Sequence, residues 1–231
     1  MKLKFRVTMS IALLAAVSIG WAADRWGARS ASLRQFDPAE VARIETQMWR
    51  SYYDRQRLAL FTQLAGLLRR QYHVPLLRSY VAAFQAAKAA FIFKDGKNID
   101  EYKRALPDLT DYYAAIRHSG DTFFDSERAA RLDLEWWIVH REPGSYRNGK
   151  LQAALSALPA EIYQIPAGLF TEHARYRAEA MVLRDNLSEQ NAMTESDWQH
   201  INRLLLQSWQ SLWEAVQNSR TAGPAPARIH N

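Results

Sequence analysis

The sequence of 231 residues contains no cysteine, and this absence removes several kinds of chemistry at once. Disulfides, thiolate nucleophiles and cysteine-ligated metal sites are all excluded, and the redox state of the compartment cannot be inferred. Glycine and proline are also scarce, at 9 and 8 residues. Because an all-β fold needs many turns rich in these two residues, such a fold is not expected.

Familiar catalytic motifs are missing as well. The chain has no Gly-x-Ser-x-Gly nucleophile elbow, no glycine-rich phosphate loop and no His-Glu-x-x-His zinc motif. It also lacks Glu-x-x-His, whose i, i+3 spacing lets two side chains of one helix reach the same metal in ferritin-like bundles. The sequence therefore leaves open whether the protein is an enzyme.

The charge is weakly basic and shows no concentration along the chain. The formal net charge is +6, but Lys2, Lys4 and Arg6 supply three of these charges, so the remaining residues carry only +3. Basic residues alternate with acidic ones instead of forming a stripe. Nucleic acid is therefore not expected as a partner, because its binding relies on a concentrated basic surface.

Residues 1–23 read MKLKFRVTMSIALLAAVSIGWAA, a basic start followed by an apolar run over residues 7–23. This pattern is typical of a secretory signal peptide, with Gly20-Trp21-Ala22 as an acceptable cleavage site. An uncleaved membrane anchor is the competing interpretation, since 17 residues is close to the shortest span of a bilayer. The third interpretation is that this apolar run forms a buried helix of the fold. We expect an extracytoplasmic protein, periplasmic or secreted, or one anchored to the membrane by this helix.

The rest of the chain predicts an all-α, single-domain bundle of about six or seven helices. Hydrophobic residues make up 48% of the sequence and aromatic residues 12%, which suits a well-packed core. We expect a connector at 24–37, the helical bundle at 38–219 and a disordered tail at 220–231. Apolar periodicity places the main helices at 38–71, 122–142, 168–186 and 195–218.

The segment 127–142, ERAARLDLEWWIVHRE, is the most unusual part of the sequence. On a helix its apolar residues cover more than half of the circumference. Asp133 and His140 lie seven residues apart and so on one face, beside Trp136 and Trp137. A carboxylate and an imidazole are therefore predicted in an aromatic part of the core.

Other predicted helices also place charged residues in the interior. Glu45 lies near the middle of an apolar stripe, and Glu172 and His173 lie at the edges of another. The candidate ligand-binding residues are Glu45, Trp49, Tyr52, Asp133, Trp137, His140, Glu172 and His173. A divalent metal is the cofactor that five of them would suit, namely Glu45, Asp133, His140, Glu172 and His173.

Three interpretations of these residues remain open. They form a structural network, with pairs such as Asp133–Arg175 or Glu45–Lys88; they hold a metal; or they line an aromatic pocket for a small ligand. The first suits a binding or interaction module with a buried polar network, whose protein partner or ligand is unknown. The alternative is a ferritin-like metal- or ligand-binding protein, an oxidoreductase among the options.

Overall fold

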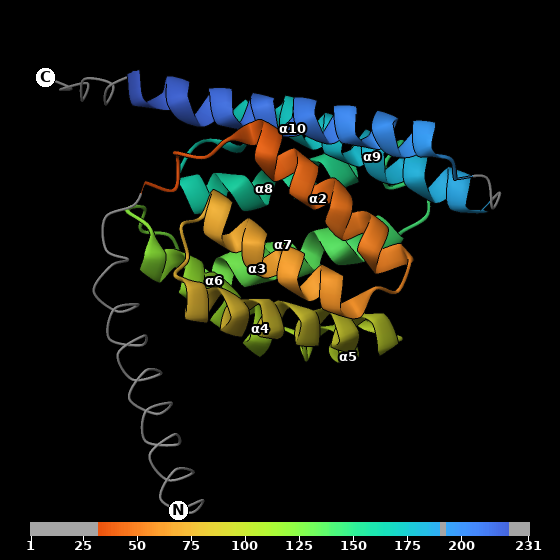
Figure 1. Ribbon diagram of the computed structural model, residues 1–231, viewed down its shortest axis with the longest axis horizontal. Helices are drawn as coiled ribbons and strands as arrows, with labels where there is room; N and C mark the ends of the chain where they lie inside the picture. The colour runs from red at the N-terminus through yellow and green to blue at the C-terminus, as the bar shows by residue number, and fades with distance from the viewer. Residues whose placement is uncertain (1–31, 190–192, 222–231) are drawn as a thin grey trace, which may run out of the picture.

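The computed structural model describes residues 32–189 and 193–221, and these residues contain helices and no strand (Figure 1). The all-α prediction is therefore confirmed. The predicted signal or anchor at 1–23 lies outside the described residues, as does the predicted tail from residue 222 onward. Among the helices that the structure does describe, none is long and apolar enough to cross a bilayer.

The described helices follow one another with short connections. In chain order they are α2 (Pro38–Tyr53), α3 (Arg57–Gln71), α4 (Leu76–Asp95), α5 (Ile99–Lys103), α6 (Leu106–Ser119), α7 (Ser126–Arg141), α8 (Lys150–Tyr163), a 3-10 turn (Ala167–Phe170), α9 (Thr171–Glu189) and α10 (Glu195–Thr221).

The helices form a closed ring. With the short α5 set aside, each helix packs against the next one in the chain, and α10 packs against α2 to complete the circle. Successive helices alternate in direction, so short loops suffice to join them (Figure 1). Every long helix therefore turns one side toward a common interior, where the candidate site lies.

The prediction of one continuous helix over 38–71 is wrong. The helix ends at Tyr53 and resumes at Arg57, and between them Arg55 adopts a left-handed backbone with φ of 60°. The two halves fold back on each other as α2 and α3. The break contains no proline or glycine, so its cause is tertiary: only a hairpin lets both halves bury their apolar sides in one core. This division adds one helix to the ring beyond the number expected.

Side-chain caps fix where the two helices that carry the interior acids begin. The Asp37 carboxylate accepts hydrogen bonds from the backbone N–H groups of Ala39 and Glu40, and Pro38 occupies the first turn of α2. Asp125 caps α7 in the same way, so this helix begins at Ser126 and not at residue 122.

The predicted connector at 24–37 is, in its described part, a piece of the core. Leu33 is fully buried, and its backbone N–H donates to Asp121. The Arg34 guanidinium donates to the carbonyl groups of Tyr163 and Val216, at the C-terminal ends of α8 and α10. Residues 32–36, which we call the end segment, thus tie together helices from three parts of the ring.

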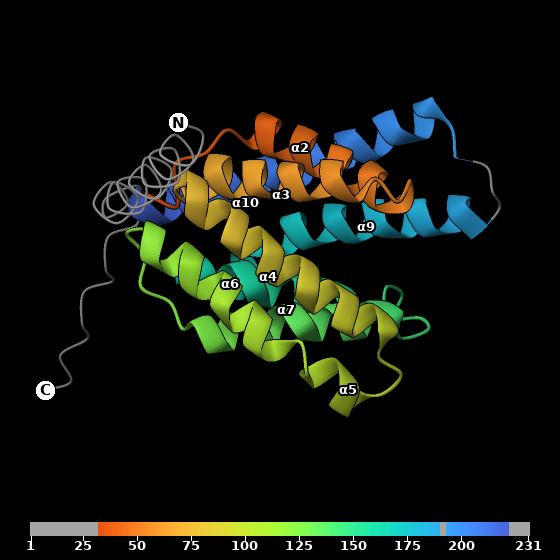
Figure 2. The same cartoon turned by 60° about the horizontal axis from the view of Figure 1, so that its bottom comes forward.

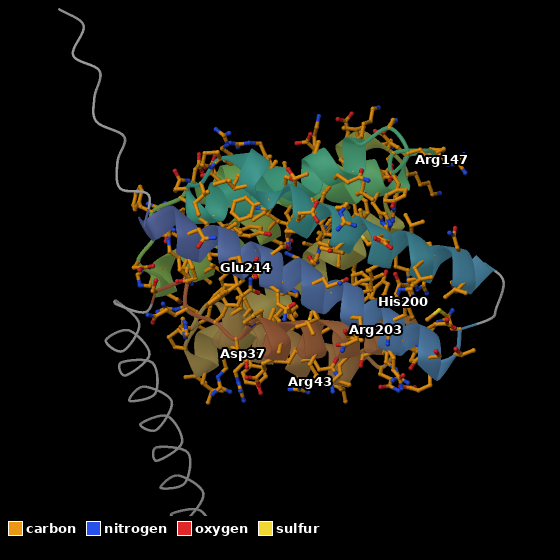
Figure 3. All side chains as sticks on the ribbon, turned by 90° about the horizontal axis from the view of Figure 1, so that it is seen from above. Asp37, Arg43, Arg147, His200, Arg203 and Glu214 are labelled. Atoms are coloured by element: carbon orange, nitrogen blue, oxygen red, sulfur yellow. The ribbon has the colours of Figure 1, made fainter. Side chains whose placement is uncertain are left out.

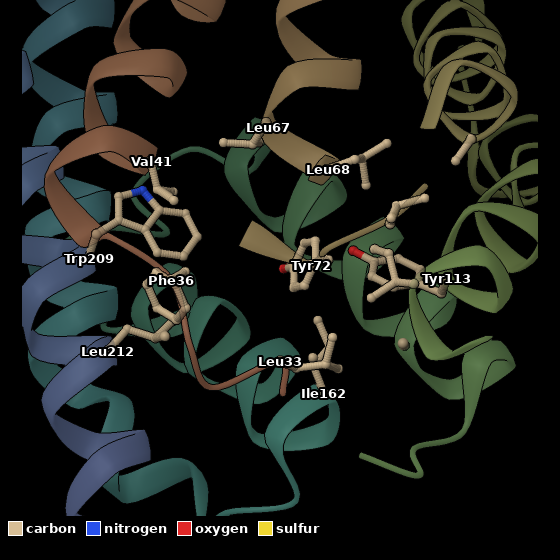
Figure 4. Packing of buried hydrophobic residues seen from close by; sticks show 14 of the residues in the cluster. Leu33, Phe36, Val41, Leu67, Leu68, Tyr72, Tyr113, Ile162, Trp209 and Leu212 are labelled. Atoms are coloured by element: carbon tan, nitrogen blue, oxygen red, sulfur yellow. The ribbon is translucent and has the colours of Figure 1, made fainter. Parts of the chain in front are cut away.

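The main core fills the ring, and Figure 4 shows part of it. The rings of Phe36 and Trp209 meet edge to face with centroids 6.1 Å apart. On α10 the predicted apolar stripe is buried, whereas His200, Arg203 and Glu214 lie on the exposed side of the helix (Figure 3). The polar outer face of α10 is what amphipathic periodicity predicts.

Candidate functional site

Glu45 on α2 is buried and held by two donors from the far end of the chain. Its Oε2 accepts from the indole N–H of Trp209 at 2.6 Å and from Nη1 of Arg177 at 2.9 Å. Its Oε1 lies 2.5 Å from Nη2 of Arg177, which completes a two-point ion pair. Such a pair is geometrically specific as well as strong. Helices α2, α9 and α10 are thereby joined in the interior.

Asp133 on α7 is the second buried carboxylate. Trp136 donates its indole N–H to Oδ1 of Asp133 at 2.6 Å, and Tyr113 and Trp137 also hydrogen-bond to the carboxylate. Burial raises the pKa of Asp133 to about 6, and these donors only partly offset that effect. The prediction that an acid lies in the aromatic part of α7 therefore agrees with the observed geometry.

The charges of both carboxylates, Glu45 and Asp133, act on Arg177 and on Tyr112. Burial alone would lower the pKa of Arg177, but the charges of Glu45 and Asp133 outweigh it and raise this pKa. Burial raises the pKa of Tyr112, and the same two carboxylates raise it further. The interior therefore holds a group of polar side chains that act on one another through their charges and hydrogen bonds, which we call the polar core: Glu45, Asp133, Arg177, Trp209, Tyr72, Tyr112, Tyr113 and Trp136.

His173 on α9 borders the polar core but is engaged elsewhere. Its Nδ1 lies 3.0 Å from the carbonyl oxygen of Ser208 and 2.8 Å from the Ser208 hydroxyl, and its ring packs 5.5 Å from that of Trp209. A bond to the carbonyl requires a proton on Nδ1. Burial lowers the pKa of His173 to about 4, so the ring is neutral at pH 7.

His140 does not meet Asp133, although both lie on one face of α7. His140 belongs to the last turn of the helix, and its Nε2 lies 3.1 Å from Oδ2 of Asp185. Burial would raise the pKa of Asp185, but the hydrogen bonds from His140 and Arg184 hold it below its ordinary value. The ion pair between His140 and Asp185 is thus a separate feature of the α7–α9 side.

The remaining candidates lie at or near the surface, and the suggested ion pairs are wrong. Glu172 is exposed and binds Arg175, so Arg175 does not reach Asp133. Lys88 binds Asp108 at 2.9 Å instead of Glu45. Tyr52 is half exposed, while Trp49 and Trp137 are partly buried and pack against the core.

Arg177 is the residue that the sequence interpretation missed. It follows His173 by one helical turn and lies between residues that are buried on α9, Ala174 and Ala178. An arginine on the interior side of a helix signals a buried acid elsewhere, because an unpaired guanidinium in a core is costly. That signal was present in the sequence, but it could not identify Glu45 as the partner.

The described residues do not support a metal centre. Nowhere in residues 32–189 and 193–221 do three or more histidine, aspartate or glutamate side chains gather closely enough to hold an ion. Of the candidates, Glu45, Asp133 and His173 share the interior, whereas His140 and Glu172 do not join them. The buried Asp133 carboxyl group can bind a proton, and the hydrogen bonds that Trp136 and Trp209 donate to the two carboxylates fix how these aromatic rings pack.

No protein-family model, curated protein or solved structure matches this chain, so its function has to be inferred from this geometry.

Proposed function

We propose that the protein is a non-catalytic binding or interaction module, exported or held at the membrane by residues 7–23, and that its polar core is structural. The observation that carries this proposal is the complete engagement of Glu45. Both of its oxygens accept hydrogen bonds from Arg177, and one also accepts from Trp209.

A carboxylate that serves a ligand or metal needs lone pairs facing an accessible space. To free Glu45 for such a ligand, the fold would have to leave the Arg177 guanidinium buried without its partner, which is strongly unfavourable. Removing the indole donor of Trp209 would add the cost of a second unmade hydrogen bond. Glu45, Arg177 and Trp209 suit a structural role, since their hydrogen bonds fix the register of α2 against α9 and α10.

A module of this kind binds through its surface. In the described part of the chain, α4 exposes more large apolar side chains than any other helix, five of twelve, a distribution that favours an interaction surface there. The outward side of α10, in contrast, carries His200, Arg203 and Glu214 (Figure 3).

Elemental analysis separates this proposal from the ferritin-like alternative. We expect purified full-length protein to contain no stoichiometric iron, manganese or zinc and to show no visible absorption band. Glu45→Gln and Asp133→Asn would then alter stability without altering any bound species. A stoichiometric metal or copurified ligand that both variants lose, with stability unchanged or raised, would instead establish the ligand-binding alternative.

The export or anchoring part of the proposal has its own test. Residues 1–35 are fused to a reporter that is active only after translocation, and we expect activity. The full-length chain is then fractionated. Recovery with membranes at the full mass indicates an anchor, and recovery in the soluble fraction with a loss of about 2 kDa indicates cleavage. Reporter activity confined to the cytoplasm would refute export.

A further inference from the structure

Helix α4 presents an apolar stripe to the outside of the ring. Figure 2 shows α3 and α4 together on the near face of the molecule. The exposed fractions are 84% for Leu58 on α3 and, on α4, 50% for Leu76, 39% for Tyr80, 50% for Val81, 61% for Phe84 and 49% for Phe91. We call these six residues, with the basic residues that surround them, the outer face. Exposed apolar residues in such a group mark an interaction site.

The outer face is also basic. Helices α3 and α4 contain six basic residues and one acidic residue, Asp95, a net charge of +5. Two of the bases pair with acids of neighbouring helices, Arg70 with Glu40 and Lys88 with Asp108, which leaves a net charge of +3. The guanidinium of Arg57 lies 5.8 Å from the ring centroid of Phe91, so cation and apolar surface are adjacent. The six basic residues are Arg57, Arg69, Arg70, Arg78, Lys88 and Lys94.

The described chain enters the fold beside the start of α4. The carbonyl oxygen of Gln35, in the end segment, lies 2.6 Å from Nε2 of His73, and Pro75 opens α4 two residues later. Eight residues, or nine steps along the chain, separate Ala23, where the apolar run ends, from Ser32, where the described chain begins. An extended chain of that length reaches about 30 Å. A run that is held in a bilayer thus keeps this end of the outer face close to the lipid.

We propose that the outer face rests on an anionic lipid bilayer, the same bilayer in which residues 7–23 anchor the chain. This inference builds on the anchored form of the proposed function. The aromatic rings of Tyr80, Phe84 and Phe91 enter the interfacial region, where amphipathic and aromatic side chains are stable. The amine of Lys94 and the guanidinium group of Arg57 extend to lipid phosphates while their stems lie along the apolar surface.

The charge favours a bilayer over a second copy of the chain. Two outer faces packed against each other would bring two groups of net charge +3 together, and α3 and α4 offer Asp95 alone as a compensating acid. Like charges across an interface cost several kcal/mol. Anionic lipid supplies the opposite charge and an apolar phase at once.

The absence of cysteine makes the test direct, because one introduced cysteine carries the only label. Full-length Phe84→Cys and Arg203→Cys, labelled with a nitroxide, are reconstituted into vesicles of phosphatidylcholine with phosphatidylglycerol. Position 203, on the exposed side of α10, is the matched control. We expect collisions with oxygen to exceed collisions with a water-soluble nickel complex several-fold at position 84 and not at position 203. Vesicles of phosphatidylcholine alone should weaken the difference.

Three results would overturn the inference, and each has a different meaning. A chain on the vesicles with position 84 open to the nickel complex retains the anchor and rejects lipid contact by the outer face. A label at 84 that is shielded from both reagents and broadened by a second label identifies a dimer instead. A full-length chain that does not associate with vesicles rejects the anchored form of the proposed function, and the inference with it.

Discussion

At the scale of single residues, Glu45 and Arg177 form an ion pair in which both side chains are mostly buried, so breaking it leaves an uncompensated charge in the interior. Both side chains are largely removed from water, and they meet through two short contacts. The net gain from forming a buried pair is small, because desolvation consumes most of the Coulomb attraction. Loss of one partner is different, since the other charge then stays buried without compensation.

We therefore expect Glu45→Gln to destabilise the fold by about 3 kcal/mol or more. The amide keeps the shape of the side chain and one acceptor for Trp209, but it removes the charge that balances Arg177. Urea unfolding followed by circular dichroism measures the change. Glu179→Gln is the matched control, because Glu179 pairs with Arg175 at 3.6 Å on the surface and should change stability by under about 1 kcal/mol. Equal effects of both variants would show that the buried pair is not special.

The buried Asp133 makes the stability of the fold depend on pH, and this contribution can be measured as the difference between the wild type and Asp133→Asn. In the folded protein its pKa is about 6, above the ordinary aspartate value of 3.8, so between these pH values the unfolded state releases its proton first as pH rises. Stability due to this group is therefore lost as pH rises, by roughly 3 kcal/mol in total. Burial lowers the pKa of His173 to about 4, which acts in the opposite direction, because its unfolded state binds a proton first as pH falls.

The Asp133→Asn variant has no carboxyl group to titrate at this position. His173 is present in both the variant and the wild type, so its contribution to the pH dependence of stability cancels when the two are compared. We expect the unfolding free energy of this variant, relative to wild type, to increase by about 2–3 kcal/mol between pH 4 and pH 7. Urea titrations at one-unit steps of pH provide the measurement. A difference that stays constant over this range would mean that ionisation of Asp133 carries no penalty in the folded protein.

At the scale of elements, the ends of helices decide the packing. Gly120 follows α6, and a Cβ built there would lie 2.3 Å from side-chain atoms of Leu33, which is fully buried. The end segment can approach α6 so closely only because residue 120 has no side chain. Gly66 on α3 has no such neighbour within 4 Å of a built Cβ.

The two glycines form a matched pair for substitution. Gly120→Ala should destabilise by about 1–3 kcal/mol, because the fully buried side chain of Leu33 would have to shift to make room for the methyl group. Gly66→Ala should stabilise by about 0.5–1 kcal/mol, since alanine is the better helix former and a built Cβ at this partly exposed position meets no neighbour. Thermal melts of the two variants test both signs together. A neutral Gly120→Ala would show that the end segment is loosely held.

Periodicity and capping were enough to predict most elements, but not how they meet. Asp37 and the stripe of α10 follow from local patterns, and burial of Asp133 follows from its place among aromatic residues. The break near Arg55 and the pairing of Arg177 with Glu45 depend on which helices become neighbours. Helical spacing places His140 and Asp133 on one face of α7. They lie too far apart along the helix to share a partner, so His140 contacts Asp185 and Asp133 accepts from Trp136.

At the scale of the whole molecule, the ring predicts one cooperative unit. Each long helix has two neighbours in the ring, and removing any one would expose apolar faces on both sides. We expect urea unfolding curves from far-ultraviolet circular dichroism and from tryptophan fluorescence to coincide. Both signals should report on the ring, because tryptophans lie on α2, α7 and α10. Two separate transitions would instead divide the ring into independent halves.

Because α2 and α10 close the ring, α2 is synthesised well before one of its two neighbours in the ring. The bond between Glu45 and Trp209 spans 164 positions of the chain. At a synthesis rate of about 5–20 residues per second, roughly 8–33 s pass between the appearance of the acid and that of its donor. During this interval α2 can pack against α3, but the side of α2 that contacts α10, with the Glu45 carboxylate, has no permanent neighbour. A nascent chain of this protein therefore offers a holding chaperone a target on that side of α2.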